Sequence, residues 1–185
     1  LVGSEMCIRD SIQRLYDRFP TAGIEYFCIK TIHILRRNAY VTEHLNHEGV
    51  SWKEGPPIDP AQPWYKALFA DDLEKKDAME AFSATFPHPG VRFVSSSENY
   101  LEMLPEQASK GNALVKAAEL AGFRMENVYA IGDYYNDTEL LEAAGVSVVP
   151  ENAPDDLKEQ ADLVVGHCYQ GAVADLIEEI ERRHR

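Results

Sequence analysis

The 185-residue chain has few cysteines and no long apolar run. Its three cysteines, Cys7, Cys28 and Cys168, lie far apart, and none belongs to a CxxC pair or to a Cys/His ligand spacing. The sequence therefore predicts neither a disulfide framework nor a zinc site. Because no apolar run could span a bilayer and no signal peptide is recognisable, the cytoplasm is the expected location.

Basic residues are scarce relative to acidic ones. Lysine and arginine together number 18, against 31 aspartates and glutamates, which gives a formal net charge of −13. Such a surface repels nucleic-acid backbones and anionic membranes, so neither is expected as a partner. A small phosphorylated substrate remains compatible with this charge where a cation or a helix N-terminus locally reverses the field.

The spacing of hydrophobic residues, which make up 45% of the chain, divides it into three parts. Residues 1–10 show no clear period, and we interpret them as a non-native or disordered leader. Residues 11–106 mix strand-like runs with few helices, a pattern typical of an α+β domain. Residues 107–185 alternate helix and strand and predict a doubly wound, Rossmann-like α/β fold.

The sharpest local signal is segment 131–137, IGDYYND, where an apolar strand meets the start of a helix. Asp133 directly follows the strand, and Asn136 and Asp137 fall in the first helical turn. Parallel α/β sheets bind ligands at the carboxyl ends of their strands, and helix N-termini attract anions. Two carboxylates and an amide there suit Mg²⁺ beside a phosphate. Taken alone, the same three residues are equally compatible with ordinary helix capping.

Lys110 strengthens the first of these interpretations. It opens the helix before this strand, in the pair Lys110-Gly111, and from there its ammonium group can reach the same edge of the sheet. At that edge it can neutralise a phosphoryl group as a point charge. A lysine without such neighbours would be an ordinary surface residue. Its position relative to GDxxND favours a shared phosphate site.

His44 and His47 are the other candidates for metal ligands. They are three residues apart and can share one face of a helix. Because no third ligand lies near them in the sequence, we interpret them as part of a solvated helix face.

Four stretches resemble the C-terminal core of Cof-type phosphatases, which form part of subclass IIB of the haloacid dehalogenase (HAD) superfamily. They are KGNALVKAAELAG, VYAIGDYYNDTELLEAAG, VPENAPDDLKEQADLVV and GAVADLIEEI. Upstream, WYKALFADDLEKKDAMEAF and VRFVSSSENYLEMLP resemble that subclass's α/β cap domain, which selects the substrate. The resemblance runs from Ser11 to the end and is looser before Trp64. It implies a HAD-type hydrolase, a phosphatase of small phosphorylated metabolites such as sugar phosphates.

The resemblance also implies a role for each matching residue. Lys110 matches the lysine that contacts the phosphoryl group, which makes it the catalytic candidate. Asp133 matches the aspartate that binds Mg²⁺, and Asp137 matches the acid that orients the metal site, so both are assigned to the metal. Asn136 matches an asparagine that contacts the substrate phosphate. Asn152, in the Asn-Ala pair, matches a position near that phosphate.

The largest departure from the family concerns the nucleophile. The resemblance calls for a DxD pair of aspartates on the first core strand, where an aspartyl-phosphate forms and is then hydrolysed. The 185 residues contain no aspartates at i and i+2. We therefore expect a C-terminal fragment that does not turn over substrate by itself. The alternatives are a non-catalytic module that binds Mg²⁺, phosphate or another protein, and a phosphomutase of the same subclass.

Overall fold

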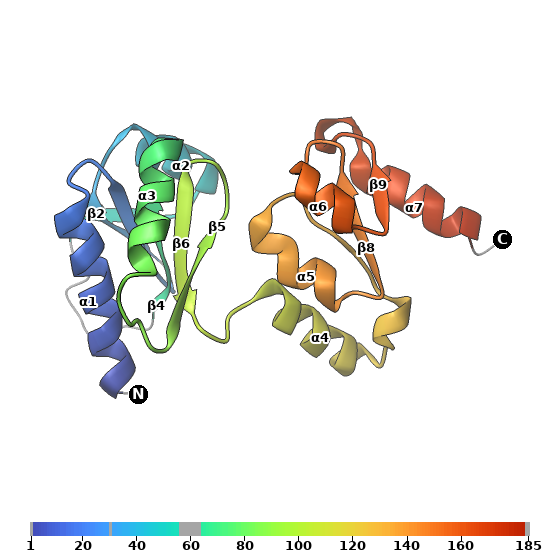
Figure 1. The fold of residues 1–185 in the computed structure, drawn as a ribbon, viewed down its shortest axis with the longest axis horizontal. Helices are drawn as coiled ribbons and strands as arrows, with labels where there is room; N and C mark the ends of the chain where they lie inside the picture. The colour runs from blue at the N-terminus through green and yellow to red at the C-terminus, as the bar shows by residue number, and fades with distance from the viewer. Residues whose placement is uncertain (1, 30, 56–63, 184–185) are drawn as a thin grey trace. The chain divides into compact units, whose positions relative to one another are not determined.

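The computed structural model describes residues 2–29, 31–55 and 64–183, which have a mixed α/β fold (Figure 1). The chain divides into two compact units, Leu1–Gln107 and Ala108–Arg185. The change in hydrophobic rhythm predicted a boundary between residues 106 and 107. Within the described ranges, no helix combines the length and the apolar character needed to cross a bilayer.

Unit 1 is built on a six-stranded sheet in the order β3-β2-β1-β4-β6-β5. Neighbouring strands are antiparallel except for β2 and β3, which run parallel because helix α2 connects them. The strands are β1 (Gly23–Cys28), β2 (Thr31–Arg36), β3 (Trp52–Glu54), β4 (Trp64–Ala70), β5 (Val91–Ser95) and β6 (Tyr100–Pro105). The helices are α1 (Val2–Arg18), α2 (Ala39–Glu48) and α3 (Leu73–Ser83).

Alternation of side chains along the strands gives unit 1 one core on each face of its sheet. Ile24 of β1 points to the face where α1 and α3 pack, and α1 and α3 lie on the same side of the sheet in Figure 1. Ile34 of β2 points to the opposite face, where Val41 and Leu45 of α2 cover it. The main core consists of Ile12, Leu15, Ala22, Ile24, Ala67, Phe69, Met79, Val91, Leu101 and Met103.

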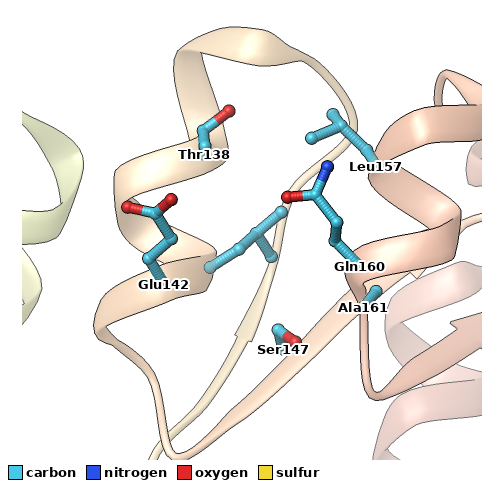
Figure 2. Close-up of a pocket in the computed structure, with 7 residues that line it drawn as sticks. Thr138, Glu142, Ser147, Leu157, Gln160 and Ala161 are labelled. Carbon is cyan, nitrogen blue, oxygen red and sulfur yellow. The ribbon is translucent and has the colours of Figure 1, made fainter.

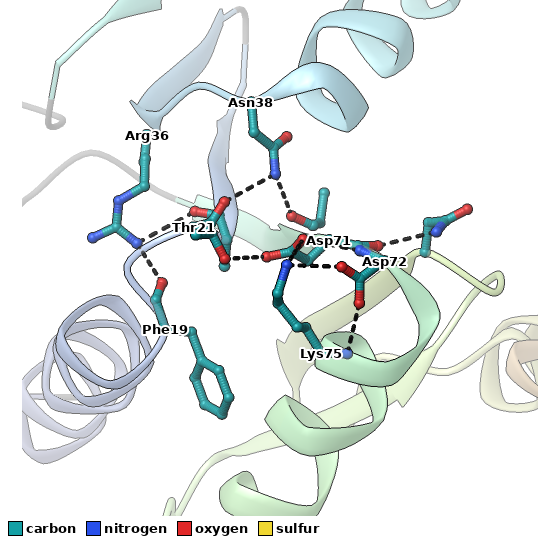
Figure 3. Close-up of polar contacts among 10 residues, drawn as sticks. Phe19, Thr21, Arg36, Asn38, Asp71, Asp72 and Lys75 are labelled. Carbon is teal, nitrogen blue, oxygen red and sulfur yellow. Dashed lines mark hydrogen bonds and ion pairs between the residues drawn. The ribbon is translucent and has the colours of Figure 1, made fainter.

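Polar side chains tie the ends of these elements together (Figure 3). Asn38 caps α2, because its Oδ1 accepts a hydrogen bond from Val41 N at 3.0 Å. Its Nδ2 donates to Ala70 O at 2.7 Å and to Thr21 O at 3.2 Å. The buried Asp71 accepts from Thr21 Oγ1 at 2.8 Å. These groups hydrogen-bond to one another, so the network holds the loops of unit 1 in place.

Helix α1 extends further towards the N-terminus than the hydrophobic pattern predicted. It begins at Val2, so the described part of the segment interpreted as a disordered leader is helical. Ile12 and Leu15, in the second half of α1, are buried in the main core. The reason is that an amphipathic helix is predicted from its hydrophobic period, and the sequence of residues 1–10 shows no such period.

The structure also corrects the interpretation of His44. Its Nδ1 lies 2.8 Å from Oε2 of Glu25 on β1, and the Glu25 side chain is completely buried. His44 therefore points at the sheet and does not belong to a solvated face, whereas His47 is exposed. A fully buried carboxylate is expected to face a potential cation because an isolated charge is costly to bury.

Unit 2 is built on three parallel strands in the order β7-β8-β9. They are β7 (Tyr129–Ile131), β8 (Val146–Pro150) and β9 (Leu163–Val165). The α-helices are α4 (Lys110–Ala121), α5 (Thr138–Ala143), α6 (Asp155–Gln160) and α7 (Ala172–Arg183). Single 3₁₀ turns form at η1 (Met125–Asn127), η2 (Tyr135–Asp137) and η3 (Cys168–Gln170). Helix α5 packs on β7 and β8, α4 packs on α5, and α7 packs on β9, which is the alternation expected of a Rossmann-like core.

Candidate active site

The parallel strands of unit 2 bring the predicted residues to one edge of the sheet. Asp133 follows β7 after Gly132, whose N–H still donates to Val148 O at 3.1 Å and so extends the strand pairing. Asn152 follows β8. Because parallel strands end at the same edge, both loops belong to the region where α/β sheets bind ligands.

Asp137 joins two other candidates directly. Its Oδ1 accepts a hydrogen bond from Lys110 Nζ at 2.5 Å, and its Oδ2 accepts from the backbone N–H of Asp133 at 3.1 Å. The Asp137 side chain is only 8% exposed, whereas that of Lys110 is 51% exposed. A buried carboxylate thus fixes the position of an ammonium group that remains open to solvent.

Two glycines make this close approach possible. A Cβ atom on Gly111 would lie 2.3 Å from Glu139 O, so only glycine lets the first turn of α4 meet α5. A Cβ atom on Gly132 would lie 2.4 Å from the Cβ of Asp137, so glycine is also needed where β7 ends. Ser109 sets the start of α4 by accepting from Asn112 N at 3.0 Å. These local features explain why Lys110 reaches Asp137.

The side chains that could bind a metal at this edge of the sheet fit a cation that needs few protein ligands. Among the described residues, no group of three or more His, Cys, Asp or Glu side chains gathers at one point. Mg²⁺ typically takes one or two protein carboxylates and completes its octahedron with water and substrate oxygens. The exposed Asp133 carboxylate suits that role, and the half-buried Asn136 lies in the same loop. Because both oxygens of Asp137 already accept hydrogen bonds, Asp137 suits an orienting role better.

Asn152 occupies the neighbouring loop and makes a contact that the sequence did not predict. Its Oδ1 accepts from the backbone N–H of Cys168 at 2.9 Å, which links the loop after β8 to η3 after β9. An asparagine anchored through its oxygen presents its amide nitrogen, a donor that can bind a phosphate oxygen.

A second link between loops also escaped sequence analysis. Tyr135 OH donates to Asp156 Oδ1 at 3.3 Å and so connects the GDxxND loop to α6. The acidic pair Asp155-Asp156 at the start of α6 is visible in the sequence, but there it predicts only a favourable helix N-terminus. At that N-terminus, the hydrogen bond from Lys158 lowers the pKa of the neighbouring Asp155 below its usual value. No sequence signal distinguishes the acid that contacts Tyr135.

The chain resembles proteins of one family throughout most of its length. The sequence model of haloacid dehalogenase-like hydrolases matches residues 9–177. The chain is 36% identical over 125 residues to the 5-amino-6-(5-phospho-D-ribitylamino)uracil phosphatase YwtE of Bacillus subtilis (strain 168), covering 66% of this chain and 43% of that protein. It is 38% identical over 175 residues to a phosphoglycolate phosphatase of Methanothermobacter thermautotrophicus, covering 95% of this chain and 68% of that one.

A solved structure extends the similarity to the fold. A haloacid dehalogenase-like hydrolase from Bacteroides thetaiotaomicron superposes with a TM-score of 0.73 at 26% identity, covering 92% of this chain and 66% of the other. The chain therefore spans about two fifths of the first relative's length and about two thirds of this structural neighbour.

Proposed function

Because the chain belongs to the haloacid dehalogenase-like hydrolase family, we propose that its 185 residues carry the metal- and phosphate-binding part of a phosphatase. Its substrates are small phosphorylated metabolites, with sugar phosphates the first class to test. The observation that carries this proposal is the contact of buried Asp137 with both Lys110 and Asp133 at the ligand-binding edge of a parallel sheet. The two relatives described above are both named as phosphatases of small phosphorylated molecules.

Each residue of this site has a role in the proposal. Mg²⁺ held by Asp133 would supply Lewis-acid stabilisation of the charge on the phosphoryl oxygens. Lys110 donates to the phosphoryl group, and Asp137 holds its ammonium group in position. Asn136 and Asn152 donate amide hydrogens to phosphate oxygens. Hydrolysis then depends on positioning and electrostatic stabilisation, the main contributions of a protein to phosphoryl transfer.

Unit 1 has a different role in the proposal. We propose that its six-stranded sheet, with helices α1, α2 and α3, forms the α/β cap that the resemblance implies over residues 11–106. We assign to it the selection of the organic part of the substrate.

The nucleophile is the missing element. No two aspartates of the 185 residues stand at i and i+2, so the DxD pair of the family is not among them. We therefore expect this chain to bind Mg²⁺ and phosphate without turnover. Loss of a nucleophile typically costs several orders of magnitude in rate, because the remaining groups supply only binding and electrostatics.

The proposal is tested by measuring phosphate release from p-nitrophenyl phosphate and a panel of sugar phosphates, with and without Mg²⁺. The 185-residue chain should show no turnover. A chain extended at its N-terminus by the DxD strand should hydrolyse at least one ester in a Mg²⁺-dependent way, and Asp133→Ala should abolish that activity. Mg²⁺-dependent turnover by the 185-residue chain would place the nucleophile elsewhere.

The alternatives are separated by also measuring Mg²⁺ binding and by analysing the sugar phosphates after the reaction. An extended chain that binds Mg²⁺ but releases no phosphate from any ester would favour the non-catalytic module. Transfer of phosphate between positions of a sugar phosphate, without release, would favour the phosphomutase.

A further inference from the structure

A cavity of about 100 Å³ lies between helices α5 and α6 of unit 2 (Figure 2). Its apolar lining comes from Leu141 of α5, Leu157 of α6 and Ala161 directly after α6, and both leucines are buried. Its polar lining consists of Thr138, Glu142, Ser147 and Gln160. None of the residues assigned to the phosphate and the metal lines it.

The polar groups around this cavity are mainly hydrogen-bond acceptors. Thr138 Oγ1 donates its hydrogen to Tyr135 O at 2.9 Å, and Ser147 Oγ donates its own to Asp162 Oδ2 at 2.9 Å. Gln160 Nε2 donates to Asp156 O at 2.9 Å. Figure 2 shows the amide oxygen of Gln160 directed towards α5. Both hydroxyl hydrogens are therefore used inside the protein.

The exposed Glu142 adds a carboxylate to this rim. Carboxylate, hydroxyl and amide oxygens above an apolar floor match a ligand that has several N–H donors, a positive charge and a short aliphatic body. The net charge of −13 favours cations over anions over the surface as a whole.

The volume limits the size of such a ligand. An apolar cavity of roughly 150 Å³ holds a benzene molecule, so about 100 Å³ accommodates roughly four or five heavy atoms. We propose that the α5–α6 cavity binds a small alkylammonium ion of three to four carbons. The alkyl body lies on Leu141, Leu157 and Ala161, and the ammonium group faces Glu142, Thr138 and the oxygen of Gln160.

The test uses n-butylammonium as the probe and two molecules of the same length, 1-butanol and butyrate, as comparisons. Each is titrated at constant ionic strength into the 185-residue chain while backbone amide shifts are followed by NMR. Saturable shifts at Thr138, Leu157 and Ala161 are expected with n-butylammonium, at a millimolar dissociation constant suited to so small a ligand. Its affinity should exceed that of 1-butanol about threefold to fivefold, as for an exposed ion pair, and butyrate should not bind.

Two matched variants test how much the charge of Glu142 contributes to the binding of n-butylammonium. Glu142→Gln should remove most of the preference for n-butylammonium over 1-butanol. Glu159→Gln removes the same charge from α6 at an exposed position outside the cavity lining, and it should keep the preference. Equal loss in both variants would mean a general attraction of cations to an acidic surface and would overturn the proposal.

A third variant tests the location. Ala161→Leu fills the apolar floor and should abolish binding of both n-butylammonium and 1-butanol. Unchanged binding in a folded Ala161→Leu variant would overturn the proposal. If this variant does not fold, the comparison of probes on the unaltered chain decides. Equal affinity for n-butylammonium and 1-butanol would then contradict the proposal. Chemical shift changes spread over other acidic regions would contradict it as well.

Discussion

At the scale of single residues, Asp137 holds the candidate site together through one carboxylate that bonds Lys110 and the backbone of Asp133. A charge-assisted hydrogen bond to a buried carboxylate is stronger than a neutral one. It also removes conformational freedom from a lysine whose side chain is half exposed. In the proposed site, a phosphate would therefore meet an ammonium group that is already in place.

Lys110→Met tests this role. Removing the positive charge should weaken the binding of inorganic phosphate, in the presence of Mg²⁺, by about tenfold or more. Lys116→Met is the matched control, because Lys116 is on the same helix and pairs with the exposed Glu119. Titration calorimetry measures both variants. Equal phosphate affinity in the two would remove Lys110 from the site.

Gly111→Ala tests how α4 meets α5. The added Cβ would lie 2.3 Å from Glu139 O, so the two helices must separate. We expect unit 2 to lose about 1–3 kcal/mol of unfolding free energy and its phosphate affinity to fall, because Lys110 moves away from Asp137. Leu120→Ala, on the same helix at a residue that is 80% exposed, should cost far less. Urea denaturation followed by circular dichroism compares the variants, and similar costs would contradict the close-contact explanation.

At the scale of elements, the cap of α2 controls how that helix packs on the sheet. The Asn38 side chain accepts a hydrogen bond from Val41 N and donates to Ala70 O and to Thr21 O. Asn38→Ala should destabilise unit 1 by about 2–3 kcal/mol, as the sum of a lost helix cap and two lost hydrogen bonds. Both tryptophans of the chain lie in unit 1, so their fluorescence during denaturation reports on it. The exposed Asn46, substituted by alanine on the same helix, should have little effect.

The connection between β8 and β9 predicts a dependence on pH. Asp162 Oδ2 accepts from Ser147 N at 2.8 Å and from Ser147 Oγ at 2.9 Å, and these bonds lower the pKa of Asp162. A lowered folded-state pKa stabilises the fold above the unfolded value, near 3.9, and this contribution is lost as pH falls through the folded value.

Asp162→Asn should therefore lower the denaturation midpoint of unit 2 at pH 7, and the difference from the unaltered chain should shrink towards pH 2. Denaturant titrations at several pH values, followed by circular dichroism, provide the measurement. A difference that stays constant with pH would show that the Asp162 carboxylate contributes no charge-dependent stability.

The elements also show which features a sequence can predict. The helix–strand alternation after residue 107 and the GDxxND loop were predictable, because they depend on local periodicity and on a glycine directly after a strand. The bond from Lys110 to Asp137 was not, because it depends on how closely α4 approaches α5. The contact of Asn152 with Cys168 depends in the same way on tertiary packing. The helical backbone before Ile12 was missed because those residues show no apolar period.

At the scale of the whole molecule, we propose that recognition of phosphate and metal belongs to unit 2 alone. The residues assigned to phosphate and metal all belong to unit 2, while unit 1 holds the larger hydrophobic core. The difference in hydrophobic rhythm between the two parts of the sequence predicted two units, without showing what either of them does. The buried Glu25 that faces His44 was not predictable, since glutamate is usually exposed and an isolated one in a strand-like run gives no sign of burial.

The central claim is that unit 2 forms a Mg²⁺-dependent phosphate site centred on Asp133. It is tested most directly by titrating inorganic phosphate into the 185-residue chain, with and without Mg²⁺, for the unaltered chain and for Asp133→Asn. We predict that Mg²⁺ tightens phosphate binding about tenfold or more in the unaltered chain and has no effect in the variant. Phosphate binding that does not depend on Mg²⁺, or an equal Mg²⁺ effect in both proteins, would contradict the claim.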